Sequence, residues 1–166
     1  PSGNGFSLPA SSKRLLVFVG GGIGVAPLFF LARKAKAKNK IVLVGSRSKG
    51  QVLCEKEFKN SGCDVKISTD DGSLGLKGRV TDLLKDILDS KIAEENAVLI
   101  YACGPRPMLK VVSRLAAQYG LPAQVSLEEH MGCGIGACLG CVVKTKNGLE
   151  RVCKEGPVFN ASDLIW

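Results

Sequence analysis

Mostly apolar segments of strand length alternate with helical segments along most of this chain. The strand-like segments occupy residues 15–19, 41–44, 65–67, 97–100 and 123–127, and the helix-like ones 25–37, 51–60, 81–90 and 105–119. In the third helical segment the apolar side chains recur on one face, at Leu83, Leu84, Ile87 and Leu88. Apolar strands that alternate with helices are typical of a parallel sheet covered on both faces. We therefore predict an α/β fold with a five-stranded, parallel, doubly wound sheet over residues 13–127.

Two shorter regions flank this predicted domain. Residues 1–12 are rich in glycine and serine and open at Pro1 rather than at methionine, which indicates a linker left from a preceding domain. Residues 128–166 are too few for a core of their own, so we expect a small subdomain that a cofactor stabilises. Within it, residues 141–153 read as a β-hairpin with its turn at Asn147 and Gly148.

Four cysteines in the C-terminal region carry the strongest chemical signal. Cys133, Cys138, Cys141 and Cys153 follow a Cys-x4-Cys-x2-Cys-x11-Cys spacing, and the first three match the ligand run of plant-type [2Fe–2S] clusters. Four glycines lie between Met131 and Cys141, where they allow the backbone to approach inorganic sulfide. The spacing therefore predicts a [2Fe–2S] site that moves single electrons.

Other uses of these cysteines stay open. A structural zinc site also takes four cysteines, but it usually has two Cys-x2-Cys knuckles, and only Cys138 and Cys141 form one here. Disulfides are disfavoured because the cysteines number seven and we find no signal peptide. A Rieske centre needs two histidines, and His130 is the only histidine, which we expect at the surface or beside the ligands.

A glycine-rich loop between the first strand and the first helix predicts a nucleotide site. Gly20, Gly21, Gly22, Ile23 and Gly24 stand where a dinucleotide pyrophosphate meets a helix N-terminus. The match to the G-x-G-x-x-G pattern is imperfect, because Pro27 stands near the position of the helix-packing glycine. The acid expected after the second strand is replaced by Ser46 and Arg47, which would suit a 2′-phosphate, so the choice between NAD and NADP stays open.

Cys103 ends the fourth predicted strand, at the sheet edge where ligands bind in open α/β folds. It should therefore share a rim with the glycine loop. Cys54 and Cys63 are expected to be packing residues. We find no general base or nucleophile to assign, so the chemistry is expected to be that of the cofactors.

Bulk composition excludes several classes of protein. The chain has 166 residues and is 45% hydrophobic, yet no apolar run approaches the roughly 20 residues that span a bilayer. The formal charge is +8, but much of it comes from a run that reads as a solvated helix end, namely Arg33, Lys34, Lys36, Lys38 and Lys40. With 5% aromatic residues and no nucleic-acid module, we expect no nucleic-acid partner. Unpaired cysteines favour the reducing cytoplasm.

Several short motifs together resemble one family. They are GGGIGVAPL (20–28), GSR (45–47), TDDGS (69–73), GRVTDLL (78–84), CGPRPML (103–109) and the cysteine run. They are similar to the electron-transfer subunit of NAD-dependent dihydroorotate dehydrogenase (type B), in the ferredoxin reductase superfamily. The resemblance covers nearly the whole chain, and its cysteine spacing is the most specific part.

This resemblance implies site residues and partners. The glycine loop would hold the NAD pyrophosphate, with Pro27 and Asp70 also at the nucleotide, and Cys103, Gly104 and Pro105 would lie beside the nicotinamide. The four cysteines would ligate the [2Fe–2S] cluster. Electrons would pass from FMN on a dihydroorotate dehydrogenase catalytic subunit, in a heterotetramer of pyrimidine biosynthesis, through the cluster and FAD to NAD. The family's FAD-binding barrel, with its Arg-x-Tyr-Ser segment, is not found in this chain. We therefore expect the chain to be inactive alone. Two alternative functions stay open. The chain could belong to an oxidoreductase subunit that uses another acceptor such as ferredoxin, or it could be a non-enzymatic, zinc-stabilised nucleotide-binding module.

Overall fold

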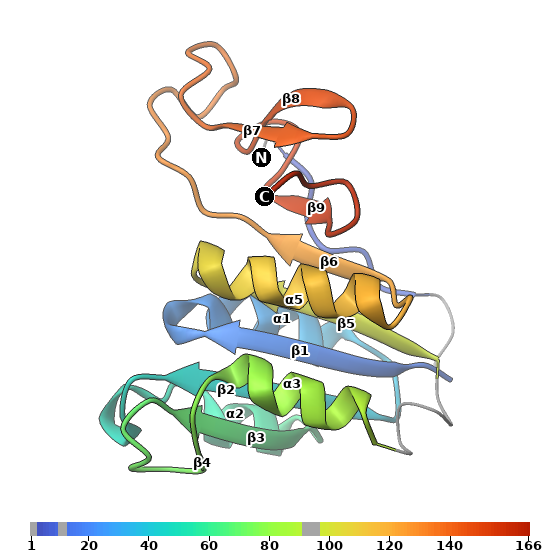
Figure 1. Ribbon diagram of the computed structural model, residues 1–166, viewed down its shortest axis with the longest axis vertical. Helices are drawn as coiled ribbons and strands as arrows, with labels where there is room; N and C mark the ends of the chain where they lie inside the picture. The colour runs from blue at the N-terminus through green and yellow to red at the C-terminus, as the bar shows by residue number, and fades with distance from the viewer. Residues whose placement is uncertain (1–2, 10–12, 91–96) are drawn as a thin grey trace.

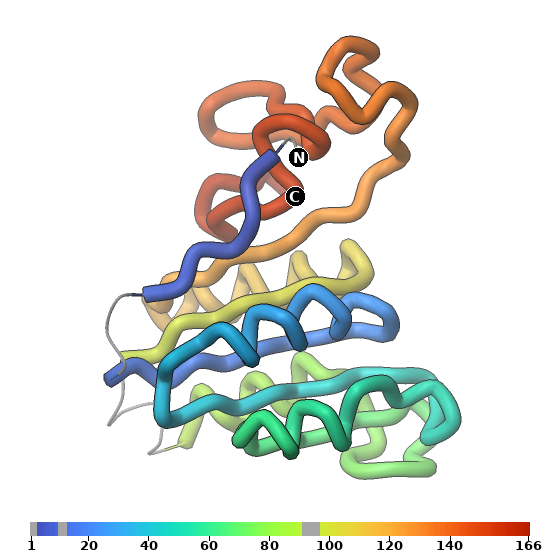
Figure 2. The backbone as a smooth tube through the Cα atoms, turned by 180° about the vertical axis from the view of Figure 1, so that it is seen from behind, coloured from blue at the N-terminus to red at the C-terminus, as the bar shows by residue number. Residues whose placement is uncertain are grey.

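The computed structural model describes residues 3–9, 13–90 and 97–166. Its elements, in chain order, are β1 (Leu15–Gly21), η1 (Gly22–Gly24), α1 (Val25–Lys34), β2 (Lys40–Ser46), η2 (Lys49–Gln51), α2 (Glu55–Asn60), β3 (Asp64–Thr69), β4 (Leu76–Lys77), α3 (Val80–Leu88), β5 (Val98–Cys103), α5 (Arg106–Gln118), β6 (Ala123–Ser126), β7 (Val142–Thr145), β8 (Gly148–Arg151) and β9 (Val158–Asn160). They form three layers, with α3 and α5 on one face of the central sheet and α1 and α2 on the other (Figures 1 and 2). The α/β prediction is confirmed.

The central sheet has the order β4-β3-β2-β1-β5-β6-β9. The five predicted strands are present and run parallel, but the structure adds two strands to them. The short β4 extends the sheet beside β3, and β9 pairs antiparallel with β6 at the opposite edge. Two- and three-residue strands carry too little pattern to be recognised in the sequence, so the prediction of five strands was too low.

Packing explains why β1 and β5 form the centre. Every residue of both strands is buried, as apolar coverage on both faces requires. On one face Ile100 and Leu84 belong to a core under α3 and α5, and on the other Phe58 and Tyr101 belong to a core under α1 and α2. The strands predicted from apolar runs are therefore the ones that the two helix layers cover.

The N-terminal and C-terminal segments are attached to each other and to this sheet. Asn4 forms a β-bridge with Pro157, and the Tyr101 hydroxyl donates to the Ser7 carbonyl oxygen at 2.8 Å. Phe159 in β9 pairs with Val125 in β6. Figure 2 shows the N-terminal segment running beside the C-terminal region. The region after β6 is thereby held against the sheet by hydrogen bonds as well as by the chain connection.

The basic run after α1 is only partly a solvated helix end. The helix ends at Lys34, and Lys36 and Lys38 are exposed in the linker that follows. Lys40, by contrast, is half-buried, and its Nζ donates to the carbonyl oxygens of Ala32 at 3.3 Å and Ser61 at 2.9 Å. This lysine thus satisfies a carbonyl near the C-terminus of α1 and joins α1 to the end of α2. In the part of the chain that the structure describes, no helix is long and apolar enough to cross a membrane.

Candidate functional site

The glycine loop and the Cys103 segment meet at one edge of the sheet. From β1 the chain moves outward on one side through β2 and β3, and later on the other side through β5 and β6. Gly20 at the end of β1 therefore pairs with Cys103, and the adjacent Gly21 pairs with Gly45 at the end of β2. A reversal of strand order of this kind opens a crevice at the carboxyl ends of the strands, where dinucleotides bind.

A cavity of about 940 Å³ lies at this edge. Eight of the residues predicted to contact the nucleotide line it: Gly21, Gly22, Ile23, Ser46, Arg47, Asp70, Gly104 and Pro105. They come from the ends of four different strands and the loops after them, and α1 begins directly after the glycine loop. The volume is at the upper end of the range for small-molecule and cofactor sites. The structure thus brings most of the predicted nucleotide residues together.

The other four predicted residues, Gly20, Gly24, Pro27 and Cys103, do not line this cavity. A β-carbon on Gly24 would lie 2.3 Å from the Cys103 carbonyl oxygen, and one on Gly20 would lie 2.6 Å from a Val25 methyl carbon. These two glycines therefore allow α1 to approach the ends of β1 and β5. Pro27 lies on the exposed side of α1. Gly22, in contrast, has a φ of +55° and no atom near the place of a β-carbon, so it leaves room at the cavity mouth.

Sequence reasoning missed several residues that line the cavity, namely Gly45, Gln51, Leu53, Ser68, Gly78, Arg79, Val80, Thr81, Pro107, Met108, Val111 and Glu128. Ser68 is the most informative, because its hydroxyl is fully buried and has no hydrogen-bond partner among the described residues. Such a group has unsatisfied hydrogen-bonding capacity that a ligand can use. Ser68 directly follows the predicted third strand (65–67), which signals this edge, whereas the absence of a hydrogen-bond partner is visible only in the folded chain.

Cys103 is buried behind the residues that line the cavity, and its surroundings do not favour a reactive thiol. Its side chain is 2% exposed. Burial raises the pKa of this thiol, a hydrogen bond with Ser126 opposes that shift, and the charge of Glu128 adds to it. A raised pKa keeps the thiol protonated at neutral pH, whereas nucleophilic cysteines are thiolates.

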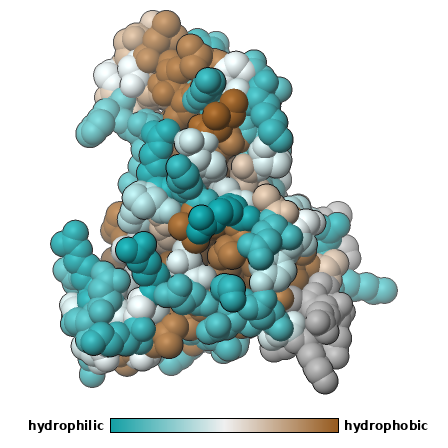
Figure 3. All heavy atoms as spheres, viewed as in Figure 1, coloured by the Kyte–Doolittle hydropathy of each residue, from teal (hydrophilic) through white to brown (hydrophobic). Residues whose placement is uncertain are grey.

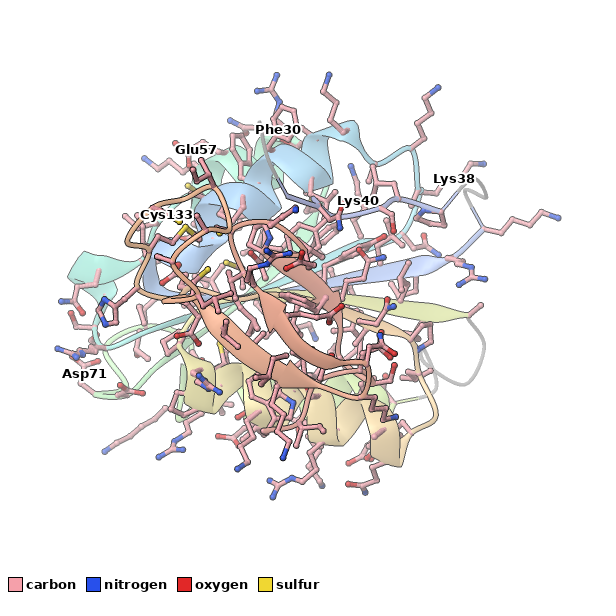
Figure 4. All side chains as sticks on the ribbon, turned by 90° about the horizontal axis from the view of Figure 1, so that it is seen from above. Phe30, Lys38, Lys40, Glu57, Asp71 and Cys133 are labelled. Atoms are coloured by element: carbon pink, nitrogen blue, oxygen red, sulfur yellow. The ribbon has the colours of Figure 1, made fainter. Side chains whose placement is uncertain are left out.

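The cysteine loop projects above the sheet between β6 and β7 (Figure 1). Cys133 and Cys138 lie close together at its exposed end, where the backbone N–H groups of Ala137 and Cys138 both donate to the Cys133 sulfur at 3.3 Å. Backbone hydrogen bonds, first from Cys138 and then from Ile135, lower the pKa of Cys133 from its ordinary value of 9.0 to about 6. Figure 4 shows Cys133 on this loop with further sulfur atoms nearby. The geometry favours a thiolate, which is the form that binds iron.

Cys141 and Cys153 form a second, buried pair at the base of the loop. The Cys153 N–H donates to the Cys141 sulfur at 3.4 Å, which is the main reason that the pKa of Cys141 is lowered. The pKa of Cys153 is raised, first because its side chain shares a hydrogen bond with the Cys141 sulfur. The predicted hairpin is confirmed and brings this pair together, although β8 already begins at Gly148, so the turn falls at Lys146 and Asn147.

The two pairs match the donor set of a dinuclear cluster. Among residues 3–9, 13–90 and 97–166, no three His, Cys, Asp or Glu side chains are placed to chelate one metal ion. A [2Fe–2S] cluster with four cysteines takes two of them on each iron, so two separate cysteine pairs are the donor set that it needs. The tetrahedral zinc alternative requires one convergent set of four.

An ion pair and a short connection join this loop to its surroundings. The Arg151 guanidinium bonds both carboxylate oxygens of Glu155 and donates to the Gly136 carbonyl oxygen at 2.9 Å, which fixes the loop to β8. Arg106 at the start of α5 pairs with Glu129 at 2.7 Å, and the adjacent Glu128 lines the cavity. His130 is exposed, as expected. Four residues thus separate Glu128, in the cavity wall, from Cys133, the first cysteine of the loop.

Known protein families match both the region that forms the nucleotide crevice and the region that contains the four cysteines. Residues 18–114 match the family model of the oxidoreductase NAD-binding domain. The chain belongs to that family. Residues 128–165 match the iron–sulfur cluster binding domain of dihydroorotate dehydrogenase B. The resemblance stated from the sequence is therefore confirmed, together with the ferredoxin-reductase type of fold.

Relatives of known name match over the whole chain. It is 42% identical over 172 residues to a Desulforamulus reducens protein named dihydroorotate dehydrogenase B (NAD(+)), electron transfer subunit, covering 100% of this chain and 64% of the relative. A Fusobacterium nucleatum protein of the same name is 43% identical, with 99% and 63% covered. The chain thus spans less than two thirds of the length of these relatives.

Solved structures agree on the fold. A structure of an NADH-dependent reduced ferredoxin-NADP oxidoreductase superposes with a TM-score of 0.84 at 31% identity, over 100% of this chain and 58% of that one. The C-terminal domain of a Pyrococcus furiosus hydrogenase has a TM-score of 0.53 at 16% identity, over 73% and 96%, and shows the fold alone. The first likeness extends through the cysteine loop, because it covers the whole chain.

Proposed function

We propose that this chain is the NAD- and [2Fe–2S]-binding part of an electron-transfer subunit in an NAD-dependent dihydroorotate dehydrogenase complex. Electrons would come from FMN on a catalytic subunit and pass through the cluster and FAD to NAD, in pyrimidine biosynthesis. One observation carries the proposal. A dinucleotide-sized cavity and two cysteine pairs lie on one chain, and the short connection between them is anchored to α5 by the Arg106–Glu129 ion pair.

Each group of residues has a defined task in this proposal. Gly21 and Gly22 let the pyrophosphate approach the backbone, and Arg47 offers it or the ribose a positive charge. Gly104 and Pro105 form the wall against which the nicotinamide would lie. Cys133, Cys138, Cys141 and Cys153 would hold the cluster, which accepts and releases single electrons when bound. The protein itself supplies position and electrostatics.

The exposed end of the cysteine loop is the surface we assign to the catalytic partner. Met131, Ile135 and Leu139 are 51%, 73% and 63% exposed, although all three are apolar. Figure 3 shows apolar side chains gathered at this end of the molecule. Contiguous exposed apolar side chains mark protein contacts. A catalytic subunit that covers this loop would lie directly against Cys133 and Cys138, within a heterotetramer that we assign to the cytoplasm.

The test uses the complete subunit, purified anaerobically with its cofactors and mixed with the FMN-containing catalytic subunit. Dihydroorotate should reduce NAD only in the mixture. Ile135→Asp with Leu139→Asp should abolish co-elution of the two subunits and leave the visible spectrum of the cluster unchanged. Leu149→Asp is the control, because Leu149 is 74% exposed on β8, outside the cysteine loop in the sequence, and it should change nothing. Co-elution of the double variant at the wild-type level would overturn the assignment of this surface.

A second function uses ferredoxin in place of the dihydroorotate-oxidising subunit. The whole-chain likeness to the structure of a ferredoxin-NADP oxidoreductase favours it. The same preparation distinguishes the two, because NADH-dependent reduction of ferredoxin without dihydroorotate oxidation supports the second function and excludes the first.

A further inference from the structure

A second cavity, of about 430 Å³, lies along α5 on a face adjacent to the one that borders the nucleotide crevice. Its walls are α5, the turn between β7 and β8, and the C-terminal residues 161–166. Backbone hydrogen bonds from Lys146 to Asp163 and from Ile165 to Lys144 hold the C-terminal segment against the hairpin. Figure 1 shows the end of the chain beside β9, on the α5 side of the molecule. The cavity is therefore built from elements that are fixed to one another.

The floor of this cavity is apolar and aromatic. Small side chains of α5 and Leu164 line it together with Trp166, the only tryptophan of the chain. The Trp166 indole N–H is buried and has no hydrogen-bond partner among the described residues. A buried tryptophan N–H normally finds an acceptor. A ligand oxygen or ring nitrogen would supply one.

The rim of the cavity carries three cationic side chains, and no acidic side chain is among its lining residues. Lys110 and Arg114 lie one turn apart on α5, and Lys146 faces them from the hairpin turn. All three are exposed and form no ion pair in the described part of the chain. The nearby Asp163 is not a lining residue, and it already accepts hydrogen bonds from Asn160 and Ser162. The unbalanced positive charge selects an anion.

We propose that this second cavity binds a nucleoside monophosphate. The volume is slightly under half of the 940 Å³ crevice assigned to a dinucleotide, so it suits a mononucleotide. The three cations match a phosphate dianion, and the apolar floor with the indole matches a base. The two cavities lie along adjacent faces of one helix, and Val111 of α5 lines both.

Isothermal titration calorimetry of the complete subunit tests this, with saturating NADH present to occupy the first cavity. Uridine 5′-monophosphate is the probe, and uridine and inorganic phosphate are the comparisons. The probe should bind at one site per subunit, and at least about tenfold more tightly than either comparison, because each supplies only half of the contacts. No heat from the probe, or equal affinity for phosphate alone, would overturn the proposal.

Variants locate the site. Arg114→Gln with Lys146→Gln should weaken binding of the probe by at least about tenfold, because two charge-assisted contacts are lost. The matched control is Lys36→Gln with Lys38→Gln, two exposed cations in the linker after α1; Figure 4 shows Lys38 extending into solvent. It removes the same charge and should leave the affinity unchanged. Equal weakening in both pairs would show that the probe responds only to net charge.

A substitution that keeps every charge gives an independent test. Ala117→Leu fills the cavity from α5, at an exposed helical position that accepts leucine. It should abolish binding of the probe while NADH affinity, measured in parallel, stays at the wild-type value. Retained binding of the probe in this variant would place the site elsewhere and refute the proposal.

Discussion

Gly24→Ala tests the close approach of the α1 N-terminus to the end of β5, on which the nucleotide crevice depends. Gly24 has φ −61° and ψ −8°, so alanine fits its backbone conformation without strain. The added β-carbon would, however, lie 2.3 Å from the Cys103 carbonyl oxygen, 2.5 Å from its carbonyl carbon and 2.7 Å from the Gly104 nitrogen. All three are backbone atoms of a buried strand end, so no side-chain rotation relieves the overlap.

Two effects of opposite sign decide the outcome. Replacing glycine by alanine at a compatible site stabilises by about 0.4–1 kcal/mol through the unfolded chain. Overpacking costs about 1–3 kcal/mol, and the immobile backbone at Cys103 places this site at the upper end of that range. The net loss is therefore about 1–2.5 kcal/mol. At about 2–4 °C per kcal/mol for a chain of this size, the apparent melting temperature should fall by roughly 2–10 °C.

Thermal unfolding and NADH titration of the complete subunit measure both consequences. NADH should bind more weakly, because α1 must move away from the Cys103–Gly104 peptide that borders the crevice. Gly50→Ala is the control, since no atom lies within 4 Å of its would-be β-carbon and its φ is not positive. Equal melting temperatures for the two variants would refute the steric argument.

Three further predictions concern separate parts of the molecule. Gly22→Leu should weaken NADH binding at least about tenfold by obstructing the crevice, whereas Gly62→Leu, with a similar positive φ and open surroundings, should cost stability alone; equal NADH affinities would contradict this. Cys133→Ser should remove iron and the visible spectrum, with Cys54→Ser unaffected, and an unchanged iron content would disprove the ligand assignment. Burial raises the pKa of Tyr101 from 10.0 to about 12, so its contribution to stability should be complete below pH 10 and lost as the pH rises through 12. Tyr101→Phe should abolish that dependence in unfolding measured between pH 9 and 12, and persistence of the same slope would count against it.

Sequence pattern predicted the central strands because they are buried on both faces. These strands must be apolar whichever helices cover them, so β1, β2 and β5 can each be recognised from their own residues. The cysteine spacing is equally local, since one loop and one hairpin contain all four residues. Motifs of this kind need no long-range information.

Tertiary structure decided what depends on pairing between distant segments. β9 is a strand only because β6 has a free edge for it, and Lys40 is held only because α1 and α2 end beside it. Likewise Gly24 is a packing residue and Gly22 a cavity residue, although one position separates them. Neighbouring residues point in different directions, so the sequence predicted the glycine loop and only the packing of α1 and β5 around it assigned each glycine its role.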